Sequence, residues 1–163
     1  MQDSKNRPTR QSAPKVSKPS AKPTGTYGSR IVSETINVAC KLVYEYARQM
    51  ENLPNWASGL ATGIQQENGH WFTDSPMGKV QVDMAPRNDF GVLDHDVTLP
   101  DGTVVHNAFR VTPAGDGCVV SFVVLRLPGV SIKDLAKDVG HVANDLKALK
   151  AILEKAYPAL TLT

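Results

Sequence analysis

The sequence predicts an α+β fold in which a curved antiparallel sheet of about seven strands wraps around one long C-terminal helix. Two patterns predict it: short alternating segments joined by turn sequences between residues 62 and 127, and one apolar helical stripe after Pro128. The 163 residues, 41% of them hydrophobic, suffice for one domain with a real core. Because this helix alone is large enough to cover such a sheet, we expect the sheet to curl around it.

The first elements are predicted to be one strand and two short helices. Residues 30–38 alternate loosely, as a strand does, and residues 41–50 carry apolar side chains at three- and four-residue spacing. Pro54 then breaks the first helix and suits the first turn of a second, which carries Trp56. We expect these two helices to close the open end of the sheet.

A run of hairpins is predicted next. Asn68-Gly69 is its clearest signal, because both central residues of a type I′ turn have positive φ. Before the next loop the predicted strands are 62–67, 70–74, 79–85 and 90–99.

The following loop fixes a strand register. Pro100-Asp101-Gly102 matches a three-residue hairpin loop with a left-handed glycine, so paired residue numbers sum to 202. A shift by one residue would place acidic side chains on the apolar face. The predicted inner face is Leu93, His95, Val97, Val105, Asn107 and Phe109, and the outer face carries Asp94, Asp96, Thr98, His106 and Arg110.

The last two elements are a strand and the long helix. The strand, Cys118–Leu127, is apolar on both faces, as a covered central strand can be. The helix runs from Ile132 to about Ala156, with Ser131 as its N-cap and Asp134 where a capping box has its acid. Its apolar stripe is Leu135, Val139, Val142, Leu146, Leu149 and Leu153.

Charge divides the chain into a tail and a body. Residues 1–29 carry six bases and one acid, whereas the rest carries twelve bases and fifteen acids. We expect residues 1–28 to be a disordered basic tail, 29–157 the domain and 158–163 a C-terminal extension. The tail's bases are scattered and form no dense patch, so nucleic acid is not an expected partner.

The composition also narrows location and chemistry. No segment has signal-peptide character or the roughly 18 apolar residues of a membrane span, and the two cysteines, Cys40 and Cys118, are isolated. A cytoplasmic protein with reduced thiols is therefore expected. Because no metal-ligand spacing and no phosphate-binding glycine loop occurs, we expect no metal and no cofactor.

The segment from Val43-Tyr44-Glu45-Tyr46 to Asn52-Leu53-Pro54-Asn55-Trp56, placed after the first strand, resembles the START-related helix-grip superfamily (SRPBCC). That superfamily includes polyketide cyclase/dehydrase-like and birch-pollen-allergen-like proteins. The resemblance spans about residues 29–156. It implies a cavity between sheet and helix that binds an apolar or aromatic small molecule, and a minority of such proteins are enzymes.

His95 opposite Asn107, on an otherwise apolar strand face, is the sharpest site signal. Convergent polar groups orient ligands in apolar pockets, although a bonded His–Asn pair without a ligand gives the same pattern. Asp94, Asp96, His106 and Arg110 fall on the other face and indicate a solvated charge network. The candidate ligand-binding residues are Trp56, Trp71, His95, Asn107, Phe109 and Arg126, of which the tryptophans can equally be core.

Three functions follow from these observations. The first is non-catalytic binding of an apolar or aromatic small molecule. The second is a cyclase- or dehydratase-like enzyme with His95 as acid or base and Asn107 or Arg126 polarising a carbonyl. The third is an interaction module that presents its sheet to a protein or a ribosome. The sequence leaves the ligand, any catalysis and a homodimeric state open.

Overall fold

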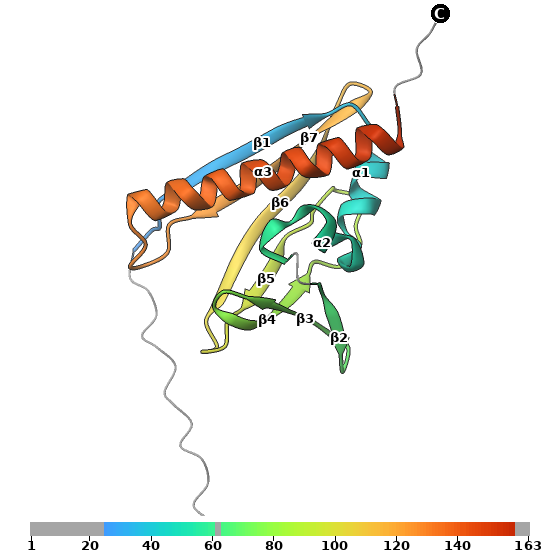
Figure 1. The fold of residues 1–163 in the computed structure, drawn as a ribbon. Helices are drawn as coiled ribbons and strands as arrows, with labels where there is room; N and C mark the ends of the chain where they lie inside the picture. The colour runs from blue at the N-terminus through green and yellow to red at the C-terminus, as the bar shows by residue number, and fades with distance from the viewer. Residues whose placement is uncertain (1–24, 61–62, 159–163) are drawn as a thin grey trace, which may run out of the picture.

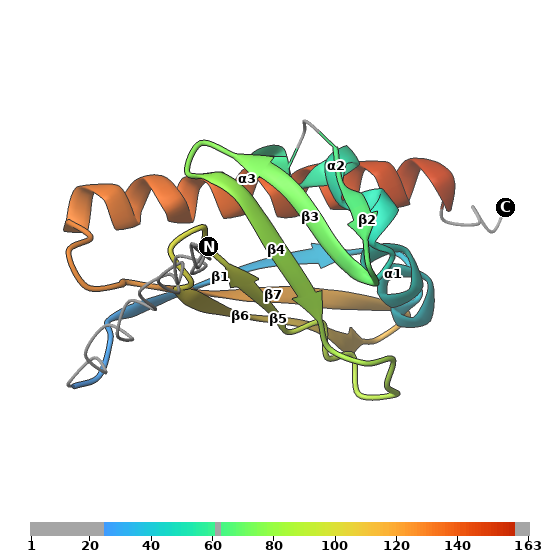
Figure 2. The same ribbon diagram turned by 90° about the horizontal axis from the view of Figure 1, so that it is seen from below.

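The computed structural model describes residues 25–60 and 63–158, and it confirms the predicted α+β fold (Figure 1). Its seven strands form one antiparallel sheet in the order β1-β7-β6-β5-β4-β3-β2. Figure 2 shows the long helix lying along one side of this curved sheet. The strands are β1 (Ser29–Ile36), β2 (Gln65–Glu67), β3 (His70–Ser75), β4 (Gly78–Met84), β5 (His95–Thr98), β6 (Val104–Ala114) and β7 (Gly117–Leu125).

Two short α-helices follow the first strand, as predicted, and each is accompanied by a short 3₁₀ turn. The first α-helix is shorter than the predicted 41–50, and Pro54 occupies the first turn of the second. The helices are α1 (Cys40–Ala47), η1 (Met50–Asn52), α2 (Leu53–Trp56), η2 (Ser58–Leu60) and α3 (Ile132–Ala156). No helix within the described residues is long and apolar enough to cross a membrane.

Helix α3 begins and ends where the sequence places it. The Ser131 side chain accepts a hydrogen bond from the backbone N–H of Asp134 at 3.0 Å, and its hydroxyl donates to that carboxylate at 2.7 Å. This cap satisfies an N–H that the first turn leaves unpaired. The fully buried members of the predicted stripe are Leu135, Leu146, Leu149 and Leu153.

Both turns that define strand register have the predicted geometry. Asn68 and Gly69 have φ of 50° and 85°, and Gly102 has φ of 86°. In the second turn the N–H of Leu99 donates to the carbonyl of Thr103 at 2.8 Å. The resulting register confirms the predicted pairs His95–Asn107, Asp96–His106 and Val97–Val105.

The predicted strand 90–99 is wrong in its first half, since β5 begins only at His95. The Asn88 side chain accepts from the N–H groups of Phe90 and Val92 at 3.0 and 3.1 Å and donates to the Val92 carbonyl at 2.9 Å. These bonds replace a strand ladder with an ordered loop, as asparagine side chains often do. Phe90 is left 86% exposed at the surface.

Strand β7 is central in the sheet, but only its inner face is covered by helices. Val120 and Val124 are buried against the core, whereas Val119 and Val123 on the other face are half-buried. The described helices lie on the inner side (Figure 2). The expectation that both faces of this strand are covered is therefore wrong for the outer face.

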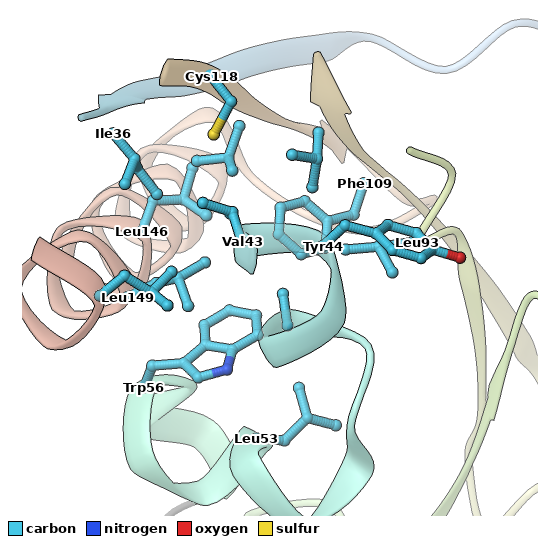
Figure 3. Packing of buried hydrophobic residues seen from close by; sticks show 14 of the residues in the cluster. Ile36, Val43, Tyr44, Leu53, Trp56, Leu93, Phe109, Cys118, Leu146 and Leu149 are labelled. Atoms are coloured by element: carbon cyan, nitrogen blue, oxygen red, sulfur yellow. The ribbon is translucent and has the colours of Figure 1, made fainter. Parts of the chain in front are cut away.

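The core lies between α3, the short helices and the inner face of the sheet (Figure 3). Phe109, Val120 and Cys118 enter it from the sheet, Leu146 and Leu149 from α3. Close packing of these side chains holds α2 and its Trp56 against the sheet.

Candidate functional site

A cavity of about 190 Å³ lies between the inner face of the sheet and helices α2 and α3. The sheet contributes apolar side chains from β4, β5 and β7, and the helices contribute Trp56, Val142 and Leu146. Alternation places every second residue of β4 and β5 on this wall. The two ionisable side chains among the lining residues are His95 and Asp145.

His95 is fixed in the wall of this cavity by its own backbone neighbourhood. Its Nδ1 lies 3.0 Å from the carbonyl oxygen of Leu93, and its ring centroid lies 6.0 Å from that of Phe122. Because a carbonyl oxygen only accepts, Nδ1 carries the proton. Burial lowers the pKa of His95 below its ordinary value, so the imidazole is neutral near pH 7.

The other ring nitrogen of His95 is consequently an acceptor. In a neutral imidazole protonated on Nδ1, Nε2 carries a lone pair. Among the described residues Nε2 makes no hydrogen bond. The cavity wall thus offers one acceptor without a protein donor.

Trp56 lines the cavity with a side chain that contains one polar atom. Its side chain is buried, and its indole Nε1–H has no hydrogen-bond partner within the described residues. Figure 3 shows this nitrogen on the edge of the ring turned toward Leu53, which also lines the cavity. Packing covers this N–H, which therefore carries the cost of a buried donor without a partner, roughly 1–3 kcal/mol.

An aromatic series connects the two residues. Trp56 lies 5.8 Å from Phe109, Phe109 lies 5.9 Å from Phe122, and Phe122 lies 6.0 Å from His95, all between ring centroids. These separations fall in the range of favourable aromatic pairs. Of these rings, Trp56, Phe122 and His95 line the cavity, and Phe109 packs behind them.

A wider cavity of about 550 Å³ adjoins the first on its open side. It lies between the turn at 75–77, η2 and α3, and it shares Leu60, Val97 and Asp145 with the inner cavity. Its rim on α3 carries Asp138, His141 and Asp145. The two cavities are thus contiguous, and the α3 side of the wider one is polar.

The structure brings together two of the six predicted ligand-binding residues, Trp56 and His95, as lining of the inner cavity. Phe109 is fully buried behind them in the aromatic series. Asn107 pairs with His95 across the strands without a hydrogen bond between their side chains. Trp71 packs half-buried against the core instead of lining this cavity.

Arg126 lies just past the end of β7, and its side chain does not line the cavity. Strand alternation gives it the inward parity of Phe122 and Val124, but its Nε donates to the carbonyl of Val130 at 2.8 Å. The side chain is exposed there. The loop that leads into α3 therefore holds the guanidinium at the surface.

The outer face carries the predicted charge network. Arg110 makes two hydrogen bonds of 2.7 Å to Asp94, and His106 Nδ1 lies 2.7 Å from Asp96. The hydrogen bonds from Arg110 lower the pKa of Asp94. Within the described residues no group of three His, Cys, Asp or Glu side chains is placed to hold a metal ion.

Met84 and Asp145 are among the cavity-lining residues that the sequence patterns did not single out. Met84 lies on the apolar face of an alternating strand. Its position beside His95 depends on the register between β4 and β5, which the sequence does not give. Asp145 lies at the margin of the α3 stripe, where a polar residue is ordinarily solvent-facing. Its Oδ1 accepts from the N–H of Ser58 at 3.0 Å, a long-range contact without a sequence signal.

Solved structures share this architecture, although no family model and no curated protein matches the sequence. XoxI from Bacillus cereus superposes with a TM-score of 0.63 at 14% identity, over 78% of this chain and 96% of its own. CalU16 from Micromonospora echinospora superposes with a TM-score of 0.58 at 14% identity, over 80% of this chain and 76% of its own. The protein Ara h 8.0201 superposes with a TM-score of 0.57 at 12% identity, over 80% of this chain and 99% of its own. At such identities the likeness confirms the helix-grip fold that the resemblance implied.

Proposed function

We propose that this protein binds an apolar or aromatic small molecule in the inner cavity between the sheet and α3. The observation that carries the proposal is the cavity itself, about 190 Å³ with an almost wholly apolar lining. An apolar cavity of about 150 Å³ in another protein stays dry and binds benzene. The volume here therefore suits one aromatic ring with small substituents.

The lining also supports orientation of a ligand. The lining combines aromatic and branched aliphatic side chains from both the sheet and the helices, and His95 offers a polar contact among them. Binding sites for small molecules commonly combine an apolar lining with a few fixed polar groups. The wider outer cavity gives such a molecule a path from solvent.

Trp56 provides a direct test of occupancy. The chain has two tryptophans, so Trp71→Phe leaves Trp56, in the cavity wall, as the only one. In this variant we expect p-xylene to change the tryptophan emission with a saturable titration. Native mass spectrometry of freshly purified protein should, in parallel, show the mass of a bound small molecule.

Filling the cavity supplies the control. Val97 lines both cavities, so Val97→Phe should abolish the titration, whereas Val104→Phe, at an exposed position on β6, should leave it unchanged. A titration that survives Val97→Phe, or none in the parent, would overturn the proposal. Turnover of an added cyclic ketone, lost on changing His95, would instead favour the enzymatic alternative. A protein partner that co-purifies and is lost with residues 1–28 would favour the interaction module.

A further inference from the structure

We infer that the ligand of the inner cavity is a single-ring phenol whose hydroxyl donates to Nε2 of His95. The inference rests on the proposed binding function and names the ligand class that this cavity selects. Three features of the described residues carry it: the size of the cavity, the direction of the His95 proton, and the lack of a protein donor at Nε2.

Size restricts the ligand to one ring. The inner cavity is only modestly larger than one that accommodates benzene, and its walls come from rigid strands and from α3. Leu146 and Phe122, on opposite walls, are held by the close-packed core. A fused polycyclic ligand would have to displace these side chains, at a cost typical of overpacking.

The tautomer of His95 restricts the polar group. The Leu93 carbonyl fixes the proton on Nδ1, so Nε2 of the neutral ring accepts and cannot donate. Burial keeps the imidazole neutral near pH 7, which maintains this polarity. A ligand carbonyl or ether, which only accepts, would face the Nε2 lone pair without a proton between them.

A phenol fits the part of the wall around His95. Its hydroxyl donates to Nε2, which has no protein donor among the described residues. Its ring packs against Phe122, which lines the cavity beside His95. An aliphatic alcohol would make the same hydrogen bond but lose the ring contacts.

The test compares p-cresol with p-xylene, which differ by a hydroxyl in place of a methyl group. The Trp71→Phe protein is titrated with each, and we expect p-cresol to bind roughly fivefold tighter or more, the value of one net hydrogen bond. Without the hydrogen bond p-xylene should bind more tightly, because it leaves water more readily. Equal binding, or tighter binding of p-xylene, would overturn the hydroxyl assignment and leave the proposed binding function standing. Binding of neither compound would overturn both.

His95→Leu removes the acceptor, and His106→Leu, on the outer face, is the matched control. The preference for p-cresol should be lost in the first variant and kept in the second; a preference kept in both would overturn the assignment. A further readout needs no variant: nitrogen NMR of the histidine-labelled parent protein. We expect p-cresol to shift the unprotonated Nε2 resonance of His95 and p-xylene to leave it nearly unchanged. An unshifted Nε2 resonance at saturating p-cresol would equally overturn the assignment.

Discussion

The Nδ1–H of His95 donates to the carbonyl oxygen of Leu93, 3.0 Å away and just before the start of β5. Asn107, directly across from His95 in the sheet, makes no hydrogen bond with it. A backbone acceptor two residues back thus orients the ring and leaves the other nitrogen without a protein partner among the described residues. This arrangement gives the protein a polar contact whose direction does not depend on a neighbouring side chain.

Burial of His95 predicts a loss of stability at mildly acidic pH. Desolvation lowers its pKa, opposed by the Leu93 carbonyl and by the carboxylates of Asp94 and Asp96, while His106 adds to the lowering. The unfolded chain therefore binds a proton near pH 6.5 that the folded chain takes up only at lower pH. The free energy of unfolding should be highest above about pH 6.5 and fall as the pH drops toward the folded pKa.

Urea unfolding at pH 7.5 and 5.5 measures this effect. We expect the difference between the two pH values to shrink in His95→Leu and to persist in His106→Leu, whose ring is on the outer face beside Asp96. The same pH dependence in His95→Leu as in the parent would show that another group is responsible.

Helix α3 allows a stability prediction with a neighbouring control. Leu146 is 1% exposed and packs in the core, so Leu146→Ala should lower the free energy of unfolding by about 2–4 kcal/mol. Lys147 is exposed, and Lys147→Ala should change it by about 0.5 kcal/mol or less. Urea denaturation of both variants tests the face of the helix, and equal losses would contradict it.

Sequence patterns sufficed for the parts of the fold that depend on local chemistry. Asn68-Gly69 and Pro100-Asp101-Gly102 determine their turns, and a turn determines which residues of two strands pair. The assignment of His95 to the inner face therefore follows from the second turn and strand alternation alone. Likewise Ser131 and the leucine stripe that follows determine the start and the buried face of α3.

Contacts between distant segments were not visible in the sequence. Asn88 donates and accepts within its own loop, and its backbone N–H donates to the Tyr44 hydroxyl at 2.9 Å, which ends the apparent strand 90–99. Arg126 has the inward parity of β7 but bonds to the Val130 carbonyl instead. Alternation reports which side a residue faces, and it does not report where the covering elements end.

The basic tail carries a prediction about stability that rests on composition. The predicted disordered segment, residues 1–28, lies largely outside the described residues. Gly28 is described, and its carbonyl accepts from the N–H of Arg126 at 2.7 Å. We therefore expect deletion of residues 1–24, which preserves this bond, to leave Tm and the circular dichroism spectrum of the domain unchanged. A fall of Tm by more than a few degrees would show that the tail packs on the domain.

The pair formed by Arg110 and Asp94 predicts the start of acid unfolding. Asp94 has a lowered pKa because Arg110 donates two hydrogen bonds to it. Its contribution to the free energy of unfolding is therefore present above the usual carboxyl range and is lost as the pH falls below about 4. Arg110→Met should raise the pKa of Asp94, so its titration should begin at a higher pH. Carboxyl NMR of Asp94 measures this pKa, and an unchanged value would contradict the assignment.

Gly91 occupies the most demanding backbone position in the loop between β4 and β5. Its φ is +70°, its carbonyl accepts from the N–H of Val111 at 2.9 Å, and a Cβ here would lie 2.0 Å from the Val111 carbonyl oxygen. Gly91→Ala should lower the free energy of unfolding by about 1–2 kcal/mol, because alanine is strained in the left-handed conformation. It should lower it further because the added Cβ would force the loop away from β6. Urea denaturation measures the total.

Gly129→Ala separates the two contributions to that loss. Gly129 has φ of +83°, but a Cβ added there would meet no atom within 4 Å, so its substitution carries the conformational cost alone. A larger loss at Gly91 than at Gly129 would therefore measure how tightly the loop is held against β6. Because Leu93 follows this loop and supplies the acceptor for His95, we also expect Gly91→Ala to weaken p-cresol binding more than p-xylene binding. Equal losses of stability at the two glycines would mean that the loop can move away from Val111 without cost.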